Sequence, residues 1–138
     1  MNRIDLQGLT EIRLKEAQVL FEHGCFEGAY YLVGYVIECA LKSCIAKQIK
    51  EHDFPDLKLV KDSYTHDLDK LLSISGLRNE LEKEVKTNPR FNIDWAIIKN
   101  WSEESRYRTS IDENTVRDLF DAVAVNNGGV LAWLKSRW

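Results

Sequence analysis

Apolar residues recur every three or four positions between residues 26 and 48, which is the pattern of a helix with one buried face. This face carries Phe26, Ala29, Tyr30, Val33, Ile37, Ala40, Leu41 and Cys44. About a third of a turn away lies a second row, made of Glu27, Tyr31, Gly34, Glu38 and Lys42. The second row mixes charges and an aromatic ring with a glycine that permits close approach. We expect the first row to face the core and the second to face a partner or a cleft.

The N-terminal half predicts a helical hairpin followed by a loop. A first helix is expected from about Leu9 to Glu22, and Gly24 ends it. The central helix then runs from about Phe26 to Lys50, and the short link makes the two helices antiparallel neighbours. The stretch from His52 to Tyr64 holds a proline and scattered acids, so we expect it to be the longest loop.

The C-terminal half predicts four further helices. One opens at Thr65-His66-Asp67 and is interrupted by Gly76, and a second short helix continues to Asn88-Pro89. A short amphipathic helix is expected from Ile93 to Trp101. The last helix starts at a capping box formed by Ser110 and Glu113, and its apolar stripe reaches nearly to the C-terminus without interruption.

No segment alternates with the period of a β-strand, so the predicted fold is all-α. We expect an up-and-down four-helix bundle with one or two additional short helices. The chain of 138 residues, 44% of them hydrophobic, fits a single domain over residues 1–138. Its longest nearly uninterrupted apolar stretch, Ala29 to Ile37, is shorter than the roughly 18 residues that span a bilayer, so we expect a cytoplasmic protein without membrane contact.

The charge and the cysteine content limit the kinds of functional site that the chain can contain. The net charge is −3, which gives no global attraction to nucleic acid, so polyanion binding must be local. The three cysteines have neither disulfide nor zinc spacing, and we expect buried free thiols with no metal and no cofactor. The Gly-rich phosphate loop, His-Glu-x-x-His, Cys-x-x-Cys and Gly-x-Ser-x-Gly motifs are all missing from the sequence.

A candidate phosphate site lies before the last helix. Arg106, Tyr107 and Arg108 combine two guanidinium groups with an aromatic ring close to a helix N-terminus, which suits a phosphate. The alternative is that Tyr107 packs into the core and both arginines pair with neighbouring acids, namely Glu103, Glu104 or Asp112.

Two further residues have open roles. His66 either begins a helix with a local partner or acts as a base. Glu38 either meets an arginine in a buried pair or forms a surface ion pair with Lys42, four residues away.

These residues together resemble the HEPN superfamily (higher eukaryotes and prokaryotes nucleotide-binding). The resemblance rests on the run from Glu16 to Lys42, on His66-Asp-Leu68, and on Trp101 and Arg106-Tyr107 before a final long helix. It covers about residues 10 to 135 and implies a four-helix bundle with a further short helix, usually dimeric. Many such proteins are metal-independent ribonucleases with an Arg-x4–6-His motif, often toxins or defence proteins. Others bind nucleotides, partner a nucleotidyltransferase or lack catalysis.

This chain departs from the ribonuclease motif, because neither Arg106 nor Arg108 is followed by a histidine at the required spacing. RNA cleavage of this kind needs an imidazole to move a ribose proton. The lead expectation is therefore a non-catalytic module, in a toxin–antitoxin or phage-defence context, that binds a nucleotide or an RNA phosphate. The contacts would be Arg106, Tyr107 and Arg108, with Glu38 and Lys42 in support.

Two alternatives remain open at this point. In the first, the chain is a divergent metal-independent ribonuclease in which Arg106 or Arg108 works with His66, brought in from another helix or from a second subunit. In the second, it is purely an assembly partner of a nucleotidyltransferase, an antitoxin or another defence protein.

We also expect a homodimer built on the second row of the central helix. Its face would be formed by Glu27, Tyr31, Gly34 and Glu38, because interfaces favour tyrosine and tolerate paired charges. The alternative is that this row packs beneath the short helix from Trp95 to Trp101 within one subunit.

Overall fold

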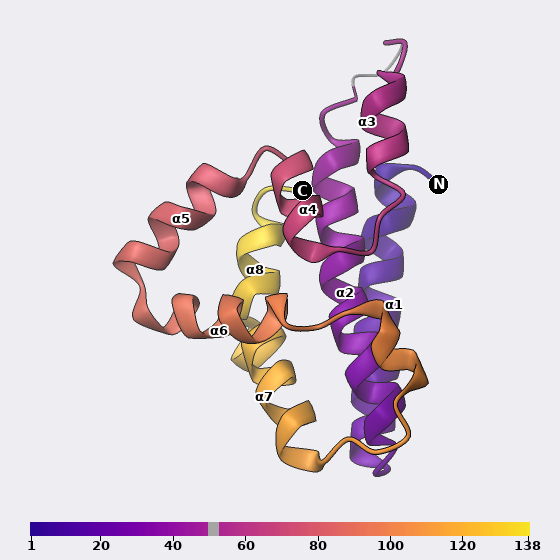
Figure 1. The fold of residues 1–138 in the computed structure, drawn as a ribbon, viewed down its shortest axis with the longest axis vertical. Coiled ribbons are helices and arrows are strands. Elements are labelled where there is room, and N and C mark those ends of the chain that lie inside the picture. Colours follow the sequence, from indigo (N-terminus) through magenta and orange to yellow (C-terminus); the bar gives the residue numbers. More distant parts are fainter. Residues whose placement is uncertain (50–52) are drawn as a thin grey trace.

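The computed structural model describes residues 1–49 and 53–138, and in these ranges the chain is all-α, with no strand (Figure 1). The elements, in chain order, are α1 (Arg3–Glu22), α2 (Phe26–Ala46), α3 (Leu57–Asp62), α4 (Leu68–Ile74), α5 (Arg78–Thr87), α6 (Pro89–Lys99), the 3-10 helix η1 (Glu103–Tyr107), α7 (Glu113–Ala124), the 3-10 helix η2 (Val125–Asn127) and α8 (Gly129–Lys135). The expectation of an all-α chain is confirmed.

The hairpin of α1 and α2 is the longest feature of the molecule. α1 begins six residues earlier than the predicted Leu9, because Asn2 and Asp5 form a capping box. It ends as expected, with Gly24 at a φ of +74°. α2 starts at Phe26 as predicted and ends at Ala46, and the predicted end at Lys50 lies outside the described residues.

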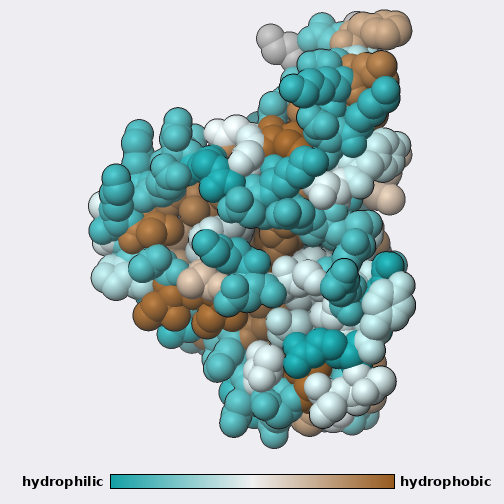
Figure 2. All heavy atoms as spheres, in the orientation of Figure 1, coloured by the Kyte–Doolittle hydropathy of each residue, from teal (hydrophilic) through white to brown (hydrophobic). Residues whose placement is uncertain are grey.

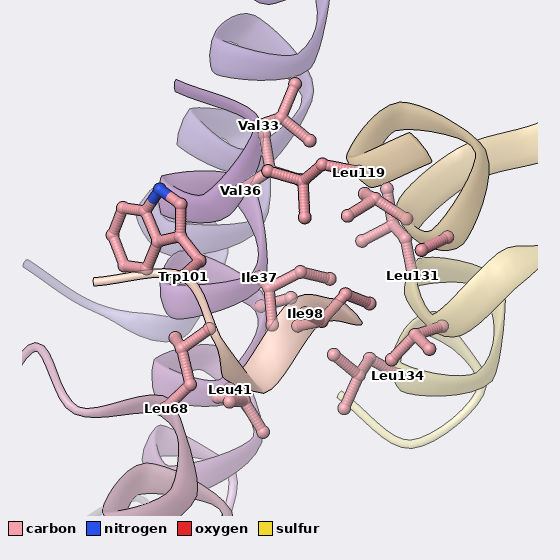
Figure 3. Packing of buried hydrophobic residues seen from close by; sticks show 14 of the residues in the cluster. Val33, Val36, Ile37, Leu41, Leu68, Ile98, Trp101, Leu119, Leu131 and Leu134 are labelled. Atoms are coloured by element: carbon pink, nitrogen blue, oxygen red, sulfur yellow. The ribbon is translucent and has the colours of Figure 1, made fainter. Parts of the chain in front are cut away.

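α2 lies at the centre of the fold, with α1, α4, α7, α8 and η1 packed around it (Figure 1). Every residue of the predicted core row on this helix is buried or partly buried. Figure 3 shows Val33 and Val36 near Leu119 of α7, and Ile37 near Ile98 of α6, while Trp101 lies on the other side of α2. Because α2 is covered on more than one side, Gly34 and Glu38 of the second row are buried as well.

The strong apolar character of α2 follows from this central position. By length and composition alone, the helix could cross a membrane, with a mean hydropathy of 1.3 over an 18-residue window. In the structure 72% of that window is buried against the rest of the chain. Core helices of soluble proteins share these properties, so the helix is weak evidence of a membrane span.

α6 packs against α7 and α8, and α5 packs on α6 at the edge of the molecule (Figure 1). α6 begins at Pro89, four residues before the predicted Ile93, since Asn88 caps its N-terminus and proline is favoured in the first turn. Apolar side chains gather on the surface over α5 and α6, whereas most of the same face is hydrophilic (Figure 2). The buried anchors of α6 are Phe91, Trp95 and Ile98.

The predicted loop from His52 to Tyr64 contains a helix. α3 forms over Leu57–Asp62 because the Asp56 side chain caps it by accepting a hydrogen bond from the Lys58 amide at 2.9 Å. The loop prediction was therefore wrong for these residues. His52 lies outside the described residues.

The last helix is split in two, so the prediction of one long helix was wrong. Asn126 and Asn127 have positive φ values of 46° and 59°, and Gly129 has a φ of +71°. Asparagine and glycine tolerate this left-handed conformation, and their run breaks the helix although the apolar stripe continues. The start of α7 also differs, because Asp112 rather than Ser110 caps it.

The cysteines are free, as predicted, but they are not all buried. Cys25 is exposed, whereas Cys39 and Cys44 are buried. Burial raises the pKa of each buried thiol to about 11, so both stay protonated at neutral pH.

Gly34 of α2 packs closely against Trp101, which lies in the segment that leads into η1. A β-carbon at this position would overlap the indole ring of Trp101. We expect Gly34→Ala to lower the free energy of unfolding by about 1–3 kcal/mol, the usual cost of overpacking a filled site. Urea denaturation followed by circular dichroism measures it.

Gly8 provides the matched control, because it lies inside α1 and a β-carbon there would meet nothing within 4 Å. Gly8→Ala should stabilise the protein by about 0.5–1 kcal/mol through helix propensity. A Gly34→Ala variant as stable as the wild type would contradict the close packing of Trp101 on α2.

Candidate functional site

The centre of the candidate site is the carboxylate of Glu38, which is only 1% exposed. Its Oε1 accepts a hydrogen bond from Lys42 Nζ at 2.8 Å and contacts His66 Nδ1 at 2.9 Å. Glu38 therefore forms a buried pair with Lys42 and also holds a histidine from the segment that precedes α4. The carboxylate is buried, as in the first of the two roles left open by the sequence, but its positive partner is Lys42 and not an arginine.

Local sequence explains how these three groups meet. Glu38 and Lys42 are four residues apart, so they lie on one face of α2. His66 precedes α4, whose N-cap Asp67 accepts a hydrogen bond from the Lys70 amide. Buried leucines on α4 fix this helix against α2 and so place His66 over Glu38; they are Leu68, Leu71 and Leu72.

The second ring nitrogen of His66 faces a second acid. Nε2 lies 3.1 Å from Glu103 Oε2, and the same oxygen lies 3.9 Å from Arg106 NH1. Glu38, His66, Glu103 and Arg106 thus form a continuous chain of ionisable groups, which we call the His66 cluster. A neutral imidazole has one N–H and can donate to only one of the two carboxylates, whereas an imidazolium donates to both.

The 3-10 helix η1 carries Glu103 and Arg106, and buried residues on either side of Glu103 hold it in place. Trp101 is 3% exposed and packs on Gly34, and Ser105 is 6% exposed. Arg106 and Glu103 are three residues apart, which brings their side chains to the same side of the short helix. The predicted turn between Ser105 and Ser110 is thus partly helical.

Aromatic rings border the His66 cluster. Tyr31 stacks between Tyr35 and Trp101, with ring centroids 6.1 Å apart in both pairs. Arg106 lies over the ring of Tyr107, 4.9 Å from its centroid, and hydrogen bonding with the Tyr107 side chain raises the pKa of Arg106. Tyr107 is 72% exposed, so it does not pack into the core as one reading of the sequence had it. Its ring is open to a ligand.

Arg108 is separate from this arrangement. Its guanidinium lies over the ring of Tyr30, 5.8 Å from the centroid. Burial raises the pKa of Tyr30, and the positive charge of Arg108 opposes this increase only in part. Among the predicted arginines, the described structure brings Arg106 and not Arg108 to His66.

The row predicted to form a dimer face is largely covered by its own chain. Gly34 packs against Trp101, Glu38 is buried, and Glu27 accepts a hydrogen bond from the Ile111 amide at 3.3 Å. Gly34 and Glu38 therefore cannot contact a second subunit unless Trp101 and His66 move away. The structure has the alternative arrangement in part, since Trp101, just past the end of α6, fills this face.

A surface hollow of about 590 Å³ opens beside His66, between the start of α4 and the segment linking α6 to η1. Its walls include His66, Asp67, Lys99, Glu103 and Glu104. Lys99 and the hollow itself were not foreseen, because nothing in the local sequence links residue 66 to residues 99–104. The described residues include no group of three or more His, Cys, Asp or Glu side chains placed to hold a metal ion.

Comparison with known proteins adds nothing to this geometry. No family model, curated protein or solved structure matches the chain. The functional argument therefore depends on the residues themselves. Chemically, the His66 cluster offers an imidazole oriented by a buried acid, a neighbouring guanidinium and an exposed aromatic ring.

Lys42 is the lysine that compensates the buried charge of Glu38. We expect Lys42→Met to lower the free energy of unfolding by about 1–3 kcal/mol, because it removes one partner of a largely buried pair and keeps the apolar stem. Lys42 is 23% exposed, so the loss should be smaller than for a fully buried pair.

Lys15→Met is the control, since Lys15 is an exposed lysine inside α1. Its effect should stay within about 0.5 kcal/mol. Urea denaturation of both variants measures the difference. Equal stability of the two variants would show that Glu38 does not depend on Lys42.

Proposed function

We propose that the chain is a HEPN-like helical-bundle protein whose His66 cluster binds a phosphate group of RNA or of a nucleotide. The observation that carries the proposal is the convergence of His66 Nε2 and Arg106 NH1 on one anionic oxygen, at 3.1 and 3.9 Å. With His66 protonated, an imidazolium and a guanidinium face one oxygen, an arrangement that can hold an anion, and in the structure this oxygen belongs to Glu103. The four-helix-bundle arrangement belongs to the proposal too, and the α1–α2 hairpin with α7 and α8 packed on α2 supports it.

A nucleobase has a place next to this phosphate position. Tyr107 is exposed and carries Arg106 on its ring. Bases of single-stranded nucleic acid stack on such rings, each stack contributing about 1–3 kcal/mol. The local positive charge of Arg106 is also needed, since the chain as a whole has a net charge of −3.

Metal-independent RNA cleavage is the second candidate function, and one contact favours it. Glu38 is buried and touches His66 Nδ1 at 2.9 Å, which fixes the ring and directs Nε2 toward the phosphate position. Acid–base catalysis by histidine needs an imidazole oriented in this way. Here the histidine comes from the segment before α4 rather than from the Arg-x4–6-His spacing of the HEPN resemblance.

Arg106→Ala should weaken RNA binding by about tenfold, which corresponds to the roughly 1.4 kcal/mol of one charge-assisted contact. Fluorescence anisotropy with a labelled single-stranded RNA in chelator at low salt measures it. Arg117→Ala is the control, because Arg117 is also a half-exposed arginine but pairs with Glu113 on α7. The binding proposal fails if the wild-type protein does not bind at millimolar concentration, or if both variants lose affinity equally.

His66→Ala should abolish RNA cleavage if the protein is a nuclease, and Glu38→Gln should reduce it, since the ring then loses its buried anchor. Incubation of purified protein with single-stranded and structured RNA in chelator, followed by gel electrophoresis, is the assay. Cleavage that survives His66→Ala would assign it to another group or to a contaminant. If the protein binds RNA but does not cleave it, the phosphate-binding proposal stands and the ribonuclease proposal is wrong.

A further inference from the structure

The carboxylate of Glu103 lies where the proposed function requires the ligand. Its Oε2 is 3.1 Å from His66 Nε2 and 3.9 Å from Arg106 NH1, so one oxygen faces both the imidazole and the guanidinium of the site. A phosphate oxygen cannot reach His66 Nε2 while Glu103 remains there. Ligand and carboxylate must compete for one position.

We propose that Glu103 is a displaceable internal substitute for a phosphodiester, and that RNA binds the His66 cluster by replacing this carboxylate. This inference rests on the proposed function and names its ligand class and its regulation. Glu103 therefore lowers the affinity of the free protein for its ligand and acts as an autoinhibitory contact.

The surroundings of Glu103 allow its side chain to leave without unfolding the site. The side chain is 34% exposed, so it can rotate into solvent. The backbone of η1 stays fixed, because Trp101 and Ser105 are buried on either side. Exposed ion pairs contribute only about 0–1 kcal/mol, which a phosphate contact can exceed.

The charge balance favours a phosphodiester over a terminal phosphate. A phosphodiester carries one negative charge, as the displaced carboxylate does, so the charge that faces His66 and Arg106 is the same before and after the exchange. A terminal phosphate carries about −1.5 to −2 at pH 7. Three further acids lie close by, namely Glu38 on His66 and the hollow-lining Asp67 and Glu104, and they oppose the additional charge.

Glu103→Gln tests the inference, with Glu104→Gln as the matched control. Both variants remove one negative charge from η1, but only Glu103 contacts His66 and Arg106. The probes are a dinucleoside monophosphate, which has one phosphodiester, and a nucleoside 5′-monophosphate. Titrations are followed by NMR through the ring signals of His66, and circular dichroism melting checks that each variant is folded.

We expect Glu103→Gln to bind the dinucleoside monophosphate about three- to tenfold more tightly than the wild type, and Glu104→Gln to change affinity by less than about twofold. Glu103→Asp, a second variant, should show a smaller gain because its carboxylate is shorter. The wild type should bind the diester more tightly than the monophosphate.

Equal gains in Glu103→Gln and Glu104→Gln would mean a general charge effect and would overturn the inference. Weaker binding by Glu103→Gln would make Glu103 a ligand contact and overturn it as well. Unchanged affinity in Glu103→Gln, with a wild type that binds, removes the inference but keeps the proposed function. If the wild type binds the nucleoside 5′-monophosphate more tightly than the dinucleoside monophosphate, the proposed phosphodiester ligand is wrong. If neither wild type nor variant binds either probe, both the function and the inference fall.

Discussion

The buried carboxylate of Glu38 is the constraint on which the arrangement of the site depends. A charge that is 1% exposed needs positive or hydrogen-bonding partners, and α2 supplies only Lys42 from its own face. The other contact is His66, so α4 must pack where it places the imidazole over Glu38. One turn earlier, Gly34 allows Trp101 onto the same face, which fixes the start of η1. Two separate segments are thus positioned by one face of one helix.

The sequence predicted the parts of the fold in which the apolar period and the breaking residues agree. The α1–α2 hairpin is one such part, because Gly24 ends α1 and the core row of α2 begins at Phe26. The last helix is the opposite case. Apolar residues recur on both sides of Asn126 and Gly129, but the left-handed conformations of these two residues break the helix. A periodic pattern records which side chains are buried and does not by itself show that the backbone stays helical between them.

The sequence predicted Arg106 together with Glu38 and Lys42, or with His66 in the ribonuclease alternative, but it did not predict the contact between Glu38 and His66. Glu38, Lys42, His66 and Arg106 were each singled out by type, but His66 and Glu38 are 28 residues apart and no local spacing joins them. Glu103 was considered only as a partner of arginine, whereas it also contacts His66. The mixed composition of the second row correctly indicated a helix face that is packed against another segment and not open to solvent. Its glycine receives a tryptophan from the same chain, an outcome that composition alone cannot distinguish from a subunit contact.

The cost of burying charge is the physical reason to connect this cluster with function. Buried ion pairs contribute little to stability compared with well-packed apolar side chains of similar volume, so stability alone does not account for Glu38 at the centre of α2. Its Oε2 has no hydrogen-bond partner among the described residues, which adds to that cost. An imidazole held by this acid on one nitrogen, with a half-exposed acid and an arginine at the other, is suited to exchanging a proton or an anion at its open side. The surface hollow beside His66 leaves room for a ligand there.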